Sequence, residues 1–275
     1  MGLPSQLSLL TSLTAYPLIL HLFSGPAPTP QRLAKSIKGT STLHSTLTTL
    51  LALHVLSQPR WYSSHPPTPL SGPSKANIAG RGIYPDDMHN PTISGRSEYA
   101  NVITAIEAGY LVQDTFALIY LSRLQGGGKR SLDKTLVTHH ITIGAALLIL
   151  HYYISQGREA GIYIIVQFLL MNASTPILNL RWYLRNFAKH RRKSILAADA
   201  AFVVAFFLAR VWLGRKILSD YGRWHGWSAW EAYWEGLRVP CKLGTGALMG
   251  ANAAWWGMLV VNTIGRTREF TLGGQ

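Results

Sequence analysis

Long runs of apolar residues alternate with short polar and basic segments along most of this 275-residue chain. An α-helix needs roughly 20 predominantly apolar residues to cross a bilayer, and seven blocks approach or exceed that length. They are residues 7–23, 41–56, 102–124, 136–154, 160–180, 195–213 and 246–264. One small soluble domain cannot bury seven such helices. The pattern therefore predicts an all-α, multi-pass transmembrane protein with seven membrane-spanning helices.

Two segments between the apolar blocks differ from ordinary short loops. Residues 58–98 are rich in Pro, Gly and Ser, which is typical of a long irregular loop. Residues 221–243 carry four Trp residues at helical spacing, namely Trp224, Trp227, Trp230 and Trp234. Because Trp is favoured where lipid headgroups meet water, we interpret this second segment as a short helix in the membrane interface.

Composition and charge agree with a membrane protein. Only 14% of the residues are charged, which is few for a soluble domain of this size. The net charge of +14 could suggest nucleic-acid binding, but the basic residues fall in the loops between apolar blocks, as membrane topology requires. We therefore predict no nucleic-acid partner. Lys and Arg are more frequent after the first, third and fifth blocks, so we expect a lumenal N-terminus and a cytosolic C-terminus.

Polar side chains from six of the predicted helices fall at similar depths in the membrane. Counted inward from the flanking basic residues at 1.5 Å per residue, they lie roughly 6–13 Å from the cytosolic boundary. These residues are His44, Asp114, His140, Asn172, Asp199 and Asn262. Half of the hydrocarbon core is roughly 15 Å thick. The agreement predicts a helical bundle around a polar chamber in its cytosolic half.

The adjacent pair His139-His140 lies inside one of these helices. Imidazoles are rare and costly in lipid, so the pair indicates a functional site. Adjacent helical residues point about 100° apart, and we expect one ring to face the chamber while the other contacts a neighbouring helix. Glu107, Tyr110 and Asp114 share one helical face, which must point into the bundle because an ionised carboxylate facing lipid is too costly.

Each of these polar residues also has a structural interpretation. Asn179, Asn262 and Ser174 could serve only as hydrogen-bonding groups between helices. His44 and Asp114, together with the His pair, could supply metal ligands. The chain lacks the spaced His clusters of membrane desaturases and hydroxylases, however, and we predict no metal site.

Four motifs in order along the chain resemble the TLC-domain family of endoplasmic-reticulum membrane proteins. The motifs are residues 41–45, Gly109-Tyr110 followed by Asp114, His139-His140, and residues 174–182. The similarity covers residues 32–268, which we take as the TLC domain. Residues 1–31 then form an additional transmembrane helix before the domain, and residues 269–275 form a C-terminal tail.

The branch that the chain resembles most is that of the small TLC-domain-containing proteins linked to lipid homeostasis, and ceramide synthases are more distant. The resemblance implies that six of the seven helices form a barrel around a lipid chamber, with the histidines near acyl-CoA at its cytosolic mouth. Ceramide synthases carry a His-Asp run and a second Asp where this chain has Met171-Asn172-Ala173-Ser174, and Thr where it has Ile143. These departures weigh against ceramide synthesis.

Two functions stay open. The first is a lipid-homeostasis protein of the endoplasmic reticulum that binds or processes acyl lipids. The second is an acyl-CoA-dependent acyltransferase. In it His139 or His140 acts as the base or accepts the acyl group, and Asp114 orients the ring.

We expect membrane lipids and fatty acyl chains as partners, and the chain could form a homo-oligomer. No cofactor is expected beyond acyl-CoA as a co-substrate. The residues expected to bind substrate are His44, Tyr110, Asn172, Ser174, Asn179, Arg181 and Asp199.

Overall fold

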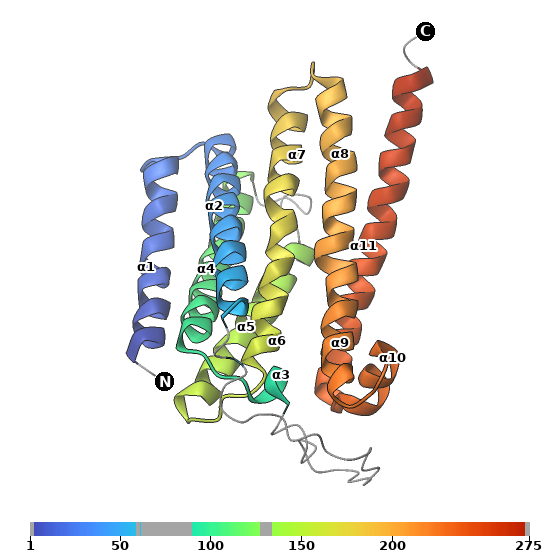
Figure 1. The fold of residues 1–275 in the computed structure, drawn as a ribbon. Helices are drawn as coiled ribbons and strands as arrows, with labels where there is room; N and C mark the ends of the chain where they lie inside the picture. The colour runs from blue at the N-terminus through green and yellow to red at the C-terminus, as the bar shows by residue number, and fades with distance from the viewer. Residues whose placement is uncertain (1–2, 59–60, 62–89, 127–133, 273–275) are drawn as a thin grey trace.

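A computed structural model describes residues 3–58, 61, 90–126 and 134–272 of the chain, and these residues form only helices and their connections (Figure 1). The helices of the first half are α1 (Leu3–Ser24), α2 (Pro30–Leu56), α3 (Pro91–Ser94), α4 (Glu98–Leu124) and α5 (Lys134–Ser155). Those of the second half are α6 (Ile162–Leu169), α7 (Thr175–Phe187), α8 (Arg192–Phe206), α9 (Leu213–Trp224), α10 (Ala229–Glu231) and α11 (Val239–Leu272). The predicted all-α class is confirmed for this part of the chain.

Within the described residues, five helical stretches are long and apolar enough to cross a membrane, where the sequence predicted seven spans. They are Pro4–Ser24, Glu98–Leu124, Lys134–Ser155, Ile162–Phe187 and Arg192–Trp224. The other two predicted spans lie in α2 and α11, which are long helices of 27 and 34 residues. Both carry many small and polar residues, which lower their mean hydropathy. A multi-pass helical membrane protein is therefore supported, with five spans by length and composition.

Two of the spanning stretches are interrupted by non-α-helical turns that carry polar residues. A 3₁₀ segment, Leu170–Ser174, separates α6 from α7, whose second residue is Pro176. Because Pro176 has no amide hydrogen, the Asn172 carbonyl accepts a hydrogen bond from Thr175 instead of an α-helical one. A π-helical segment, Phe207–Trp212, separates α8 from α9 and packs against the 3₁₀ segment. Such breaks are frequent at functional sites.

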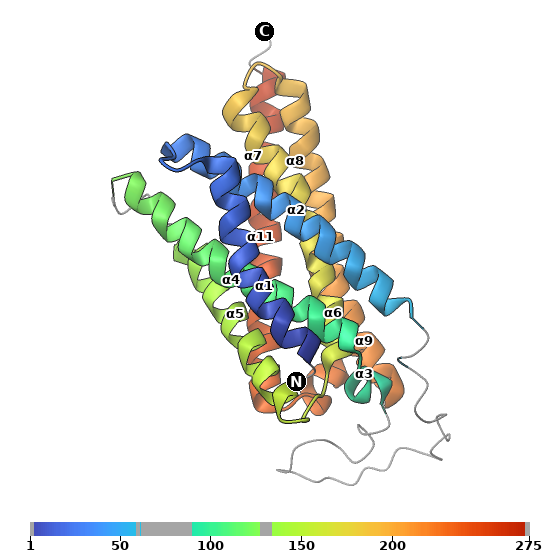
Figure 2. The ribbon, with the colours of Figure 1, turned by 90° about the vertical axis from the view of Figure 1, so that its left-hand side faces the viewer.

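Helix α4 lies at the centre of the first half and packs against α1, α2, α5 and α6 (Figures 1 and 2). In the second half, α8 packs against α7 and α11, and α7 joins the two halves by packing against α2. Helix α1 crosses α4 closely at Gly109, where an added Cβ would lie 2.8 Å from the Ser12 Cβ. The additional N-terminal helix is therefore an integral part of the bundle.

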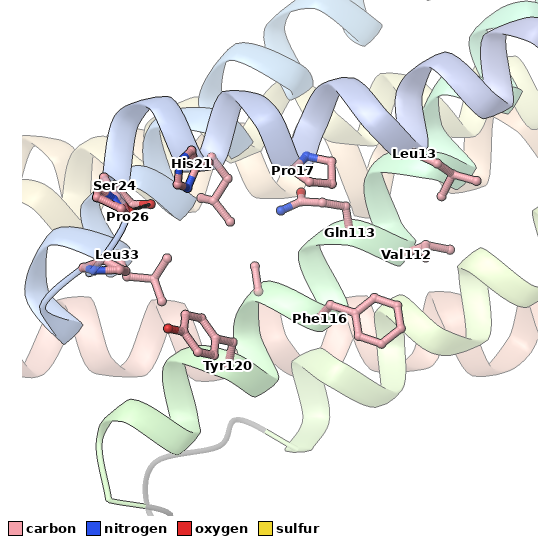
Figure 3. Close-up of a pocket in the computed structure, with 14 residues that line it drawn as sticks. Leu13, Pro17, His21, Ser24, Pro26, Leu33, Val112, Gln113, Phe116 and Tyr120 are labelled. Atoms are coloured by element: carbon pink, nitrogen blue, oxygen red, sulfur yellow. Dashed lines mark hydrogen bonds between the residues drawn. The ribbon is translucent and has the colours of Figure 1, made fainter.

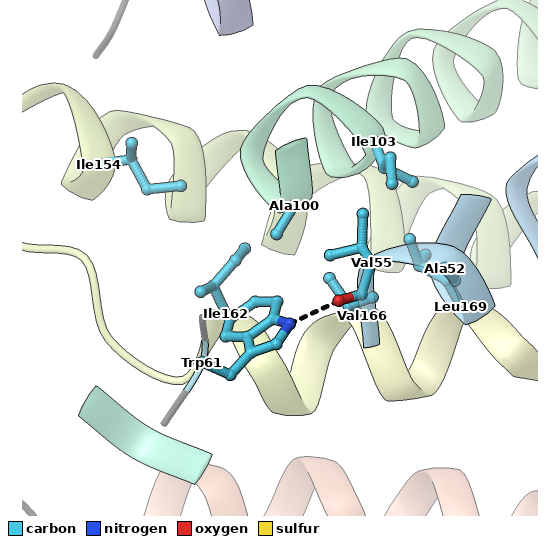
Figure 4. Close-up of a cluster of buried hydrophobic side chains, with 9 residues drawn as sticks. All are labelled: Ala52, Val55, Trp61, Ala100, Ile103, Ile154, Ile162, Val166 and Leu169. Carbon is cyan, nitrogen blue, oxygen red and sulfur yellow. Dashed lines mark hydrogen bonds between the residues drawn. The ribbon is translucent and has the colours of Figure 1, made fainter. Parts of the chain in front are cut away.

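The interior near α3 is apolar. Nine buried hydrophobic side chains from α2, α4, α5, α6 and the loop residue Trp61 pack together there (Figure 4). The Trp61 indole N–H donates a hydrogen bond of 2.6 Å to the Val55 carbonyl, which ties the start of the predicted 58–98 loop to the end of α2. Residues 62–89 of that loop lie outside the described residues.

The Trp-rich segment is partly helical, as the sequence predicted. Helix α10 continues into a π-helical turn, Ala232–Gly236, and Trp230 and Trp234 are exposed. Ser228 caps α10: its hydroxyl accepts a hydrogen bond from the Glu231 amide, and its own amide donates to the Glu231 carboxylate at 2.8 Å. These hydrogen bonds to Ser228 hold the pKa of the Glu231 carboxyl below its usual range.

Candidate functional site

One face of α4 carries three buried polar side chains at helical spacing: Glu107, Tyr110 and Asp114. Residues three and seven positions apart lie on the same side of an α-helix, and at 1.5 Å per residue the two carboxylates are roughly 10 Å apart along its axis. Each carboxylate faces a histidine from a different helix. The sequence predicted that this face points inward, and the burial agrees.

The first carboxylate forms a closed hydrogen-bonded network with His44 of α2. The His44 Nε2 lies 2.8 Å from Glu107 Oε2, and its Nδ1 lies 2.5 Å from the Tyr16 hydroxyl of α1. The Asn172 amide nitrogen donates to Glu107 Oε2 at 3.1 Å and to the Thr48 hydroxyl at 3.3 Å. Four separate parts of the chain therefore meet at one imidazole–carboxylate pair.

The His44 ring is also packed between two tyrosines. It stacks on the Tyr110 ring with centroids 3.7 Å apart, and the Tyr16 ring meets it edge-on at 5.3 Å. With both ring nitrogens in hydrogen bonds, one ring face stacked on Tyr110 and only 2% of the residue exposed, His44 has no free position for a ligand. The prediction that His44 binds substrate is therefore not favoured by its surroundings, and a supporting role is.

The second carboxylate, Asp114, faces the histidine pair on α5. Its Oδ2 lies 3.1 Å from His140 Nδ1, a distance for an ion pair, although the ring is not aligned for a hydrogen bond. His139 points elsewhere: its ring lies 6.1 Å from the Trp255 ring of α11. The two imidazoles are partly buried, and their centroids are 5.9 Å apart. His140 of α5 thus faces the polar side of α4, whereas His139 faces α11.

A third polar group lies between α7, α8 and α11. Asp199 is fully buried, and its carboxylate accepts from Arg181 Nε at 2.6 Å, Arg185 Nη2 at 2.5 Å and Arg266 Nη1 at 2.8 Å. Three guanidinium groups around one carboxylate leave a surplus of two positive charges. The Arg185 and Arg266 side chains are 29% and 35% exposed, so the surplus charge is accessible from outside the bundle.

Two predicted site residues make contacts that join helices. Ser174 accepts a hydrogen bond of 3.1 Å from Arg210 Nε of the π-helical segment. The Asn179 amide donates to the Thr42 hydroxyl at 3.0 Å and to the Lys38 carbonyl at 3.2 Å, which joins α7 to α2. These contacts agree with the structural interpretation of both residues.

The structure changes the predicted site in two respects. Asn262 is exposed on α11, so it does not join the buried polar residues with which the sequence grouped it. A depth counted along a helix does not determine which way a residue faces. Conversely, sequence reasoning missed Tyr16 and Arg210, and it placed Glu107 on the inward face of its helix without naming it among the site residues. A carboxylate inside an apolar block was the available signal for Glu107.

No three His, Cys, Asp or Glu side chains come together in the described ranges in a way that could hold a metal ion. The arrangement instead pairs single carboxylates with single imidazoles. Such a pair can hold an imidazole in a defined orientation, or take up and release a proton.

The fold and this buried polar face define the class: a multi-pass helical membrane protein with paired imidazoles and carboxylates among its helices. More specifically, the family model of the TLC domain matches residues 36–264, and the chain belongs to that family. Its members are generally linked to lipid metabolism. The resemblance noted in the sequence motifs is therefore confirmed.

The chain is also similar to TLC domain-containing protein 4-B of Xenopus laevis, with 26% identity over 178 residues. The aligned part covers 63% of this chain and 57% of the relative, so it spans little more than half of that protein's length. No solved structure matches the chain.

Proposed function

We propose that the protein serves lipid homeostasis in the endoplasmic-reticulum membrane by binding or processing acyl lipids beside the polar face of α4. The observation that carries the proposal is the two imidazole–carboxylate pairs, His44–Glu107 and His140–Asp114, set on one face of a membrane-spanning helix. Ionisable groups inside a membrane are costly, and they commonly mark the path or site of a polar ligand.

The two pairs have different roles in this proposal. The His44–Glu107 pair is enclosed by Tyr16, Tyr110 and Asn172, and it fixes the positions of α1, α2 and α4. The His140–Asp114 pair keeps more exposure, with side chains 12% and 8% accessible. His140–Asp114 is therefore the pair that meets the polar end of a lipid.

In this proposal the site lies inside a barrel of six helical units, and α1 lies outside it. The units are α2, α4, α5, α6 with α7, α8 with α9, and α11. The packing of α4 against α5 and α2, of α2 against α7, and of α8 against α7 and α11 supports this arrangement. His139 approaches Trp255 where α5 and α11 would close the ring. The lipid occupies the interior of the barrel. The connection between α7 and α8 and the end of α11 lie on the cytosolic side.

A second candidate function is acyl transfer from acyl-CoA, and the His140–Asp114 geometry favours it. A small rotation of the ring would let Nδ1–H donate to Asp114, which leaves Nε2 free to act as a base. Nε2 would take the proton from the hydroxyl or amine of an acceptor as that atom attacks the thioester carbonyl. The acyl–sulfur bond then breaks, and the imidazolium returns the proton to the departing thiolate.

The basic group around Asp199 would hold the phosphates of coenzyme A in that reaction. Arg185 and Arg266 are fixed by the buried carboxylate and keep further N–H donors for an anion. Guanidinium groups bind phosphate through paired, charge-assisted hydrogen bonds. Arg181 and Asp199 then position the site rather than contact the substrate.

The experiment is to purify the full chain in detergent, identify the retained lipids by mass spectrometry, and incubate it with labelled acyl-CoA and a panel of lipid acceptors. Retained acyl lipid that is lost in His140→Ala, with no turnover by the wild type, supports lipid binding alone. Turnover that vanishes in His140→Ala, with lipid still retained, supports the transferase.

His54→Ala is the matched control, because His54 is an exposed histidine at the far end of α2 whose side chain bonds only Gln58 in the described part of the chain. Equal lipid content in the wild type, His140→Ala and His54→Ala, without turnover in any of them, contradicts both functions.

A further inference from the structure

A cavity of about 460 Å³ lies between α1, α4 and the start of α2, apart from the histidine pair (Figure 3). Small-molecule sites commonly measure roughly 300–1,000 Å³. Leu13 and Pro17 of α1 and Val112 and Phe116 of α4 line it. Phe116, at the edge of the cavity, is 68% exposed. Helices α1 and α4 both qualify as membrane spans. The cavity therefore opens sideways, toward the lipid that surrounds the bundle.

One buried polar atom in this cavity lacks a partner. Gln113 is only 7% exposed and lines the cavity, and its Oε1 accepts no hydrogen bond from any described residue (Figure 3). Leaving a buried acceptor unpaired costs roughly 1–3 kcal/mol. An atom of this kind inside an apolar cavity indicates a ligand that carries a hydrogen-bond donor.

On the opposite wall, a proline removes one helical hydrogen-bond donor. Pro17 lies inside α1 and has no amide hydrogen, so the Leu13 carbonyl lacks the donor that an unbroken α-helix supplies four residues later. Leu13 and Pro17 both line the cavity. A carbonyl without its helical donor next to the Gln113 acceptor favours a ligand group that lies between α1 and α4.

The small number of charged residues in the lining favours a neutral ligand group over an anionic one. Among the fourteen residues around the cavity, all in the described part of the chain, there is no Lys, Arg, Asp or Glu. His21, an exposed residue near the end of α1, is the one lining side chain that can become cationic. A phosphate or carboxylate would find no permanent counter-ion there, and burying an unpaired charge is very costly. A hydroxyl is neutral, can donate to the Gln113 carbonyl oxygen and can also accept from the same amide.

We propose that this cavity, the α1/α4 cavity, binds a neutral membrane lipid whose hydroxyl group hydrogen-bonds to Gln113 and whose apolar body lies between α1 and α4. The site is separate from the proposed acyl-lipid site, because none of its lining residues belongs to either imidazole–carboxylate pair. Sterols and diacylglycerols share this chemistry, and the test separates them.

The test is photocrosslinking of the purified full chain in lipid nanodiscs, with the labelled peptides identified by mass spectrometry. The probes are photoreactive cholesterol and photoreactive diacylglycerol, compared with photoreactive phosphatidylcholine and a photoreactive fatty acid. We expect at least one hydroxyl probe to label α1 and α4 next to the cavity, in clear excess over the zwitterionic phosphatidylcholine probe and the fatty acid probe.

The variant Gln113→Leu keeps the side-chain volume and removes the acceptor, so labelling should fall about three- to tenfold, the effect of one hydrogen bond. Gln125→Leu, at the exposed end of α4, should leave it unchanged. His140→Ala should also leave it unchanged, which separates failure of this proposal from failure of the proposed function. Without added lipid, Gln113→Leu should melt no lower than the wild type, because it removes an unpaired buried acceptor.

Pro17→Ala is a second test that spares α4. It restores an amide donor for the Leu13 carbonyl, and labelling should fall again. Labelling of α1 and α4 that is equal for phosphatidylcholine, or unchanged in both Gln113→Leu and Pro17→Ala, overturns the proposal. So does crosslinking of two chains through α1 and α4, because a second copy would then cover the cavity.

Discussion

The Glu107 carboxylate is 5% exposed and is held by His44 and Asn172. Removing one member of a buried pair leaves the other uncompensated, which typically costs about 3–5 kcal/mol. Glu107→Ala should therefore lower the free energy of unfolding by about that amount in detergent. Glu98→Ala, at the exposed first turn of the same helix, should cost less than about 1 kcal/mol. Equal effects of the two variants would mean that the Glu107 pair contributes no stability.

A prediction about function also belongs to single residues. Asp114 lies against His140 and not against His139. If the protein transfers acyl groups, Asp114→Asn and His140→Ala should each reduce turnover by at least about a hundredfold, which is a common contribution of a general base. Because the two act as one unit, the double variant should be no slower than the slower single variant. Losses that multiply in the double variant would show that Asp114 does not act through His140.

Single residues show how far the sequence could predict this site. The shared face of Glu107, Tyr110 and Asp114 follows from helical spacing alone, and so does the divergence of His139 and His140. The partners of these residues do not follow, because they depend on how the helices are shifted and rotated against each other. Tyr16 could not be predicted for this reason, and neither could the exposure of Asn262.

At the scale of helices, Asp199 connects three elements through Arg181, Arg185 and Arg266. Asp199→Asn would leave three guanidinium groups without a counter-charge, so we expect a loss of about 3–5 kcal/mol in the free energy of unfolding. Asp220→Asn is the matched control. Asp220 pairs with Lys216 and Arg223 on the surface of α9, and such pairs contribute about 1 kcal/mol or less. A thermal shift assay that finds the two variants equally stable would contradict this.

The crossing of α1 and α4 gives a second prediction at this scale. An added Cβ at Gly109 would lie 2.8 Å from the Ser12 Cβ, whereas one at Gly144 meets its nearest neighbour, Leu111 Cβ, at 3.6 Å. Gly109→Ala should therefore separate α1 from α4 and cost about 1–3 kcal/mol, as overpacking does. Gly144→Ala should be neutral or stabilising, because alanine favours helices over glycine. Unfolding midpoints that rank the two variants the other way would show that α1 does not pack closely against α4.

Helices were predictable where the apolar blocks were long and uniform, as in α4 and α5. The composition of α2 and α11 explains why the sequence predicted seven spans and the structure has five stretches that qualify. Their small and polar residues bring them below the hydropathy of the other helices, although α2 carries His44 and α11 carries Arg266. The 3₁₀ break before Pro176 follows from the missing amide hydrogen, but the π-helical segment at Arg210 has no such local cause.

The orientation of the whole molecule can be tested with its one native cysteine. Cys241 is exposed at the start of α11, the end of the molecule at which α1 begins (Figure 1). The loop charges predict that this end is lumenal. A membrane-impermeant maleimide should therefore label Cys241 in sealed microsomes only after detergent is added. In a Cys241→Ser background, Gln125→Cys should react in intact microsomes. The reverse pattern would invert the topology.

The central claim is that the His140–Asp114 pair meets the polar end of an acyl lipid. The most direct measurement is photocrosslinking of the wild-type chain with a photoreactive acyl lipid whose reactive group is next to the headgroup. The account predicts that the label lies on α4 and α5 around Asp114 and His140, and that Asp114→Asn lowers it while His54→Ala does not. A label confined to the outward faces of the helices, and unchanged in Asp114→Asn, would contradict it.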